Sequence, residues 1–97
     1  DIKGLQQTAD MITKAGGKYF MYGLDVADAD NYKTVAEQFL KDVGGIDLLV
    51  NNAGVGDGGE FDKYALENWQ WMVGVNQMGV VHGCHFFVPV MLKAGTG

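Results

Sequence analysis

The chain has 97 residues, of which 47% are hydrophobic and 20% are charged, and its formal net charge at pH 7 is -5. All seven basic residues are lysines, and this acidic balance argues against a nucleic-acid surface, because phosphate binding needs a basic stripe. No apolar run approaches the roughly 20 residues of a membrane span, so we expect no membrane segment. The single cysteine, Cys84, cannot form a disulfide within the chain, which favours a reducing, cytoplasmic location.

The first half of the chain alternates helical and strand patterns. Apolar spacing predicts a first helix that stops at residues 16–17, both glycines, where a left-handed C-cap would lie. Residues 19–24 predict a short aromatic-rich strand, and Asp28 is a favourable N-cap for a second helix that ends at the glycines of residues 44–45. The apolar faces consist of Ile2, Leu5, Ala9 and Ile12 in the first helix and of Tyr32, Val35, Ala36, Phe39 and Val43 in the second. This alternation is typical of a parallel α/β sheet.

Residues 46–50 form a short, nearly continuous apolar run, which predicts a strand that is covered on both faces. Asn51, Asn52, Ala53 and Gly54 follow where this strand should end. Ligands of open α/β sheets bind outside the carboxyl ends of the strands, and small residues there let a flat ligand approach the backbone. An ordinary Asn-rich turn has a similar composition, so these residues alone leave both interpretations open.

The second half of the chain has a long helical pattern over residues 66–93, which predicts one helix or two nearly collinear ones. Its seam is formed by small or apolar residues at Leu66, Trp69, Val73, Val80, Gly83, Cys84, Phe87 and Met91. Pro89 lacks an N–H group and should bend the last turns. Gly79 and Gly83 lie four residues apart on the seam, so another segment can pack close to the helix backbone there.

Asn76 interrupts this seam on the face that the helix would otherwise bury. A buried amide needs hydrogen-bond partners, because leaving it unpaired costs roughly 1–3 kcal/mol. The side chain could therefore satisfy a neighbouring loop or mark a helix kink, or it could line a polar site at the sheet edge. The pattern by itself favours the structural role.

His82 and His85 lie three residues apart and could share one helix face as metal ligands. No Asp or Glu follows Glu67 to complete such a site, so we expect packed or surface histidines and no metal centre. Cys84 is expected to be an ordinary buried thiol.

Four stretches of the chain together resemble the short-chain dehydrogenase/reductase family. Residues 49–54 resemble its Asn-Asn-Ala-Gly motif, and residues 24–26 resemble the Asp-Val pair that ends its third strand. Residues 68–79 resemble its helix with Trp followed by Val-Asn-x-x-Gly, and residues 86–91 resemble the tail of that helix. The resemblance implies an α/β, Rossmann-like doubly wound parallel sheet, of which about two strands and three helices lie here. It also implies hydride transfer between NAD or NADP and an alcohol or carbonyl substrate.

The resemblance assigns roles to particular residues. The cofactor-binding positions would be Asp25, Val26, Asn51, Asn52, Ala53 and Gly54, and the catalytic position would be Asn76. Asp25 would meet the adenine amino group, Val26 would lie beside the adenine ring, and residues 51–54 would flank the adenosine ribose and hold the neighbouring phosphate loop. Asn76 would steady its helix and hold a water that is linked to the catalytic lysine. The family also implies a homo-oligomer formed through the helix of residues 66–93.

Several parts of the family pattern are not found in these residues. The Gly-x-x-x-Gly-x-Gly turn would precede Asp1, and the catalytic Ser and the Tyr-x-x-x-Lys pair would follow Gly97. We therefore interpret residues 1–97 as a central fragment of one NAD(P)-binding domain that is inactive alone. One alternative is a non-catalytic α/β module or truncated remnant that acts through protein contacts. Another is an atypical relative such as a nucleotide-sugar epimerase, against which the intact Asn-Asn-Ala-Gly motif argues.

Two structural expectations follow from this interpretation. Right-handed crossovers should place the helices over residues 32–43 and 66–93 on one face of the sheet, and the helix that ends near Ala15 on the other. In the family's sheet order, the strands at residues 19–24 and 46–50 are not neighbours. We therefore expect a gap between them, and we expect that the isolated chain neither folds natively nor binds dinucleotide.

Overall fold

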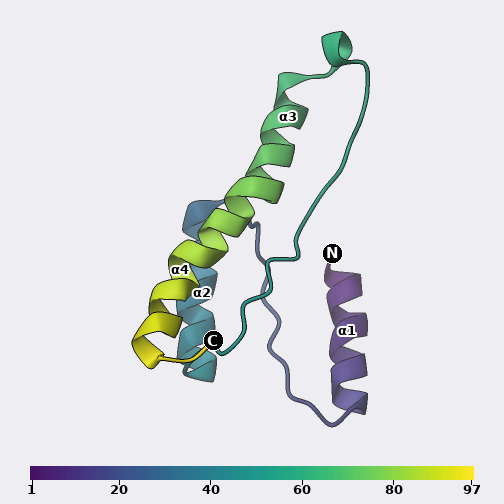
Figure 1. Ribbon diagram of the computed structural model, residues 1–97. Coiled ribbons are helices and arrows are strands. Elements are labelled where there is room, and N and C mark those ends of the chain that lie inside the picture. Colours follow the sequence, from purple (N-terminus) through teal and green to yellow (C-terminus); the bar gives the residue numbers. More distant parts are fainter.

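The computed structural model describes all of residues 1–97. Its helices are α1 (Ile2–Lys14), α2 (Ala29–Val43), α3 (Leu66–Val73) and α4 (Gly79–Ala94), with a 3₁₀ turn η1 (Phe61–Lys63) and a π-helical turn η2 (Gly74–Met78). The elements α3, η2 and α4 follow one another without a break and form one long rod (Figure 1). The prediction of one long helix, or two collinear ones, is confirmed.

The ends of the helices follow local signals in the sequence. The Asp28 carboxylate accepts a hydrogen bond from the backbone N–H of Asn31 at 3.1 Å, which confirms the predicted N-cap of α2. Gly44 ends α2 with φ 89°, and Gly16 follows α1 with φ 84°, a left-handed conformation that costs glycine little. Ala65 precedes α3 without any side-chain cap.

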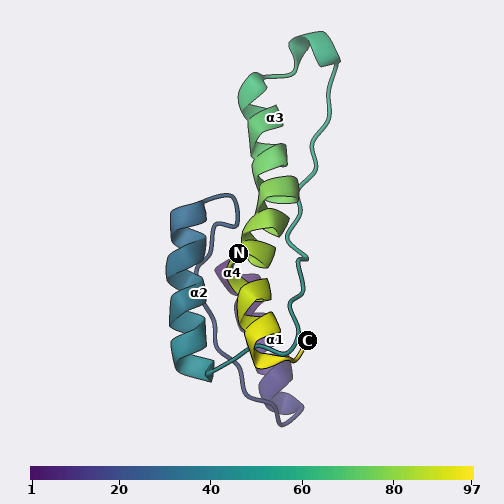
Figure 2. The ribbon, with the colours of Figure 1, turned by 60° about the vertical axis from the view of Figure 1, so that its left-hand side comes forward.

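The packed part of the molecule lies between α2 and α4, which run side by side in both views (Figures 1 and 2). Tyr32 stacks on Phe86 with ring centroids 5.8 Å apart, and Phe39 meets Phe87 edge-on at the same separation. Residues from both helices and from the adjoining extended segments close this core, namely Tyr32, Ala36, Phe87, Val26, Phe39, Leu40, Ile46, Leu49 and Phe86. The apolar face predicted for the second helix is thus confirmed at its centre.

The seam predicted for the long helix is only partly buried. Gly83 and Phe87 are buried, whereas Leu66, Trp69 and Val73 are exposed. The reason is visible in Figure 2, where α3 extends beyond the end of α2, so that α2 does not reach this part of the seam.

The helix α1 lies apart from the other helices. Figure 1 shows extended segments that run between α1 and the pair formed by α2 and α4. The helices α2 and α4 contact each other, and α1 contacts neither. In this view α1 lies on the other side of the extended segments from α2 and α4, but the predicted faces of a sheet are not defined, because these residues form no sheet.

The two predicted strands, residues 19–24 and 46–50, run as extended chain but are not paired into a sheet (Figure 1). No backbone hydrogen bond joins one of these segments to the other. A strand requires a neighbour that meets its N–H and C=O groups, and neither segment has one within these residues. The predicted partial sheet is therefore not confirmed by this chain. The expected lack of pairing between the two segments is confirmed.

The chain is also less compact than a closed domain. Its radius of gyration is 15.9 Å, whereas a compact chain of this length has about 12.5 Å. Only 7 of the 97 residues are buried. None of the helices combines the length and the apolar character that crossing a lipid bilayer requires.

Candidate functional site

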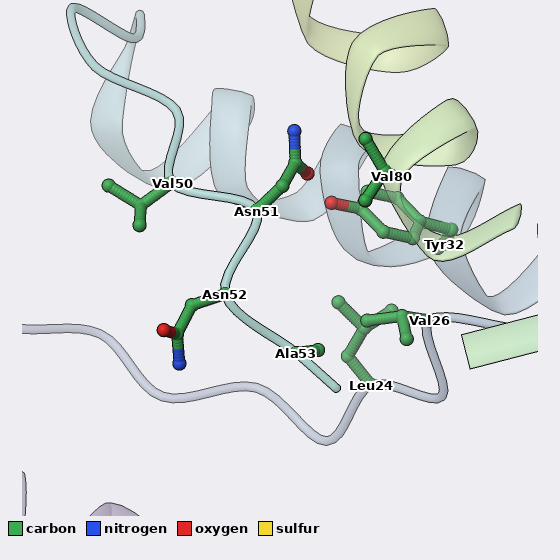
Figure 3. A pocket seen from close by; sticks show the side chains of 9 residues that line it. Leu24, Val26, Tyr32, Val50, Asn51, Asn52, Ala53 and Val80 are labelled. Carbon is green, nitrogen blue, oxygen red and sulfur yellow. The ribbon is translucent and has the colours of Figure 1, made fainter. Parts of the chain in front are cut away.

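A cavity of about 130 Å³ lies where the two extended segments meet the beginning of α4 (Figure 3). Its walls are mostly apolar, with two amides, and consist of Leu24, Val26, Tyr32, Val50, Asn51, Asn52, Ala53, Gly79 and Val80. Four of the seven predicted site residues therefore line one cavity. Asp25 and Gly54 are their chain neighbours, and Asn76 lies outside the lining.

The turn at Asp25 is held by hydrogen bonds from the residues that follow it directly and from α2. The Asp25 N–H donates to Asn31 Oδ1 at 2.6 Å, and Asp25 Oδ1 accepts from the Ala27 N–H at 3.0 Å. The Asp28 N–H donates to the Asp25 carbonyl oxygen at 3.1 Å. No hydrogen bond within the chain uses Asp25 Oδ2, and the residue is exposed, so this oxygen is free to accept from an amino group.

Val26 is held by α4. A Cβ atom on Gly79 would lie only 2.9 Å from Val26 Cγ2, so the absence of a side chain at Gly79 creates the space that Val26 fills. The close approach expected at this glycine is confirmed. One turn later on α4, His82 Nδ1 lies 2.7 Å from the Val26 carbonyl oxygen.

His82 and His85 do not face a common site. His82 is buried against the Val26 carbonyl, whereas His85 is exposed and packs edge-on against Phe86 with ring centroids 4.9 Å apart. His82 is therefore a packed histidine and His85 a surface histidine, which agrees with the expectation of packed or surface histidines. The contact between His82 and Val26 was not predicted from the sequence. The available signal was a polar residue on the helix face that also carries the two glycines.

Asn51 approaches α4 at Gly83 and Cys84. A Cβ atom on Gly83 would overlap the Asn51 side-chain oxygen and lie 2.9 Å from the Tyr32 hydroxyl oxygen. Asn51 Nδ2 donates to Cys84 Sγ at 3.7 Å. Burial raises the pKa of the Tyr32 hydroxyl above its ordinary value of 10.0, with a smaller electrostatic contribution from Cys84. The hydroxyl is therefore further stabilised in its neutral form.

The prediction of a buried thiol at Cys84 is wrong, because the residue is exposed. It lies beside the contact face of α4, next to the buried Gly83, and meets the amide of Asn51 rather than the core.

Asn76 lies in the π-helical turn η2 and reaches across to the loop that follows residues 51–54. Its Oδ1 accepts from the Val55 N–H at 2.8 Å, and its Nδ2 donates to the Val55 carbonyl oxygen at 2.8 Å. The predicted burial of Asn76 on the apolar seam is wrong, because the residue is exposed. The wider turn of η2 leaves the amide beside the loop, where Gly54 also approaches it: a Cβ there would lie 3.5 Å from Asn76 Oδ1.

The amide of Asn76 therefore satisfies a neighbouring loop, as the structural interpretation predicted, and does so beside the predicted cofactor segment. An Asn side chain has two N–H donors and two acceptor lone pairs. The pair of bonds to Val55 uses one of each, so one donor and one acceptor remain for a further partner such as water.

Comparison with known proteins gives matches over nearly the whole chain. The model of a family described as short chain dehydrogenase matches residues 2–97. The chain is 38% identical over 93 residues to the probable oxidoreductase EphD of Mycobacterium tuberculosis, covering 96% of this chain and 16% of that protein. It is 34% identical over 92 residues to the uncharacterized oxidoreductase YxbG of Bacillus subtilis, covering 94% of this chain and 34% of that protein.

Solved structures contain the same arrangement of segments. A metagenomic short-chain oxidoreductase in complex with NADP has a TM-score of 0.93 and 31% identity, over 100% of this chain and 44% of that one. A short chain dehydrogenase/reductase from Burkholderia phymatum in complex with NAD has a TM-score of 0.91 and 36% identity, over 100% of this chain and 34% of that one. The chain thus spans less than half the length of each of these four proteins.

Proposed function

The chain belongs to the short-chain dehydrogenase family, and from this premise we propose that the protein is an NAD(P)-dependent oxidoreductase. The reaction is hydride transfer between NAD or NADP and the alcohol or carbonyl group of a small molecule. The observation that carries the proposal is the convergence of Val26 with residues 51–53 on one cavity, although these segments are about 25 residues apart in the sequence.

Residues 1–97 then form the central part of one Rossmann-fold domain. Two features support this: the two extended segments lack strand partners, and the chain covers only 16% to 44% of the relatives described above. In such a domain the missing strands would lie between the two segments and pair with them. The segment alone would then be inactive.

The residues present fit the adenosine half of a dinucleotide. Val26 and Ala53 provide apolar walls for a flat ring, and Asp25 Oδ2 is an acceptor free to meet the adenine amino group. Asn51 and Asn52 add two amides to the lining of the cavity, and their side chains point in different directions (Figure 3). No basic residue lines the cavity, so its side chains offer no cationic contact to the phosphates.

Asn76 acts as the catalytic asparagine in this proposal. Its two bonds to Val55 fix the loop after residues 51–54 against the long helix, and its remaining donor and acceptor can hold a water. When bound, the nicotinamide ring supplies the hydride donor or acceptor. The residues described here bind and orient the other half of that cofactor.

The assembly and location follow the family. Exposed apolar side chains on α4, including Val80, Val81 and Val88, support a homo-oligomer formed through the helix of residues 66–93. The single unpaired Cys84 supports a place in the reducing cytoplasm.

Calorimetric titration of the intact protein with NAD, NADP and ADP-ribose tests the binding proposal. We expect binding of at least one dinucleotide and of ADP-ribose, and we expect Asp25→Ala to weaken both by roughly tenfold, the factor of one lost hydrogen bond. Asp10→Ala is the matched control, because Asp10 is an exposed carboxylate on α1 that bonds only Gln6. Absence of binding to both dinucleotides by the wild-type protein would overturn the proposal.

Turnover is tested separately by following the absorbance of reduced nicotinamide with a panel of alcohols and carbonyl compounds. Hydride transfer to any member supports the enzymatic role. Tight dinucleotide binding without turnover across the panel would favour the non-catalytic alternative.

A further inference from the structure

We propose that His82 is a positioning residue for adenine recognition, which acts by holding the Val26 carbonyl and thereby the direction of the Asp25 carboxylate. The inference rests on the proposed dinucleotide function. It concerns a residue that does not line the cavity and so acts through the turn at residues 25–26.

The hydrogen bond between His82 and Val26 is buried, and only His82 can be its donor. His82 Nδ1 lies 2.7 Å from the Val26 carbonyl oxygen, and the residue is 9% exposed. A carbonyl oxygen can only accept, so Nδ1 carries the proton and donates it. The Tyr32 ring packs against the imidazole at a centroid distance of 6.1 Å and an interplanar angle of 59°, which helps to keep the histidine in place.

The same face of α4 also holds the Val26 side chain. Val26 Cγ2 occupies the space left by Gly79, three residues before His82. Both the main chain and the side chain of Val26 are thus fixed to α4, one by a hydrogen bond and the other by close packing.

The Asp25 side of the turn is held by α2 instead. Asn31 accepts from the Asp25 N–H, and the Asp28 N–H donates to the Asp25 carbonyl. The hydrogen bond from His82 is the one that joins this turn to α4. Without it, the Val26–Ala27 peptide can rotate, and its Ala27 N–H, which donates to Asp25 Oδ1, no longer fixes the direction of the carboxylate that should meet the adenine amino group.

The experiment compares NAD with nicotinamide hypoxanthine dinucleotide, in which an oxygen replaces the adenine amino group. Dissociation constants are measured on the intact wild-type protein and on His82→Leu, which removes the donor. We expect the wild type to prefer NAD. We expect His82→Leu to bind NAD about tenfold more weakly, the factor of one buried hydrogen bond, with a smaller loss for the hypoxanthine analogue.

Two further variants separate positioning from general loss of structure. His82→Asn can place an amide donor near the position of Nδ1 and should restore most of the preference for NAD. His82→Gln places its donor one atom farther along and should not, and this pair carries the test if His82→Leu does not fold. His85→Asn on the same helix is the matched control, and its preference should equal that of the wild type.

Equal weakening of both dinucleotides in His82→Leu, or unchanged binding, would overturn the positioning role. The same conclusion follows if His82→Asn and His82→Gln show equal preferences. A wild type that binds dinucleotides without preferring NAD would overturn the inference alone. A wild type that binds neither would overturn the proposed function together with it.

Discussion

The helices α1 and α2 have similar signals at their ends but very different environments, because α2 packs against α4 and α1 contacts no other helix. All but one of the seven buried residues belong to α2 or α4, and Ala9 is the exception in α1. The helix α1 nevertheless has a side-chain cap from Asp1 and a positive-φ glycine after its end, as α2 does. Ile2 is 85% exposed and Met11 is 71% exposed.

This difference separates helix formation from helix burial. Caps and apolar spacing are local and suffice to set where a helix begins and ends. Burial requires a partner with a complementary face, and only α2 and α4 have one within these residues. The candidate site lies on the packed side, because its walls are held by Gly79, His82 and Gly83 of α4.

The largest expected effect comes from separating residues 1–97 from the rest of a dehydrogenase domain. The isolated segment should show helical signal in circular dichroism but no cooperative thermal transition, because apolar side chains such as Leu48 and Val50 remain 76% and 69% exposed. Addition of NAD should leave the signal unchanged. A sharp melting transition with a midpoint that rises with NAD would contradict this prediction.

The next effect concerns Asn76, at the turn where α4 joins α3. In the dehydrogenase that we propose, Asn76→Ala should lower kcat by roughly 10²–10⁴-fold, the range of a general acid–base contribution. Loss of the two bonds to Val55 should also lower stability by roughly 1–3 kcal/mol. Both kcat per folded molecule and melting temperature are measured on one preparation.

Asn76→Asp provides the comparison, since its carboxylate can still accept from the Val55 N–H but can no longer donate to the carbonyl. Cofactor binding through the turn at Asp25 should survive in both variants. If turnover stays at the wild-type level while the melting temperature falls, Asn76 is only an amide that fixes a loop.

A smaller effect contrasts one glycine from each region. Gly79→Ala places a Cβ atom 2.9 Å from Val26 Cγ2, and overpacking of this kind costs roughly 1–3 kcal/mol. Gly4 in the first turn of α1 meets only the flexible Asp1 side chain, at 3.3 Å. Gly4→Ala should therefore stabilise the protein by up to about 1 kcal/mol through helix propensity. The free energy of unfolding of both variants is measured with denaturant. Equal changes at Gly79 and Gly4 would contradict the prediction that only Gly79 is tightly packed.

The smallest effect concerns the extended segment that leads from α1 to α2. The Tyr22 hydroxyl donates to Asp42 Oδ2 of α2 at 2.6 Å, and this hydrogen bond, with burial and the charge of Asp42, raises the pKa of Tyr22 to about 12. The neutral phenol is favoured in the folded state. Its contribution to stability is therefore complete below the ordinary pKa of 10.0 and is lost as the pH rises through about 12.

Asp42→Ala should return the pKa of Tyr22 towards 10.0 and remove this part of the pH dependence. Tyrosinate absorbance of the intact protein is followed against pH, and Tyr22→Phe identifies the Tyr22 signal among those of the other tyrosines. Identical titration curves for the wild type and Asp42→Ala would show that the bond does not hold the phenol proton.

Much of the local structure could be predicted from the sequence. The cap at Asp28, the stops at Gly16 and Gly44, and the close approach at Gly79 all depend on residues whose conformational preferences are intrinsic. The family motifs also pointed to the cavity, since Val26 and residues 51–53 line it. These signals are local or periodic, so they can be recognised without knowing which segments contact one another.

The partners themselves were decided only by the tertiary structure. Helical spacing placed Asn76 on a buried seam, but the π-helical turn leaves it exposed and bonded to Val55, 21 residues away. The bond between His82 and Val26 spans 56 residues, and the helix pattern, which places His82 on the face of the two glycines, does not specify its partner. The strands at residues 19–24 and 46–50 have suitable sequences but remain unpaired, because a helix satisfies its backbone within its own segment, whereas a strand depends on a neighbour.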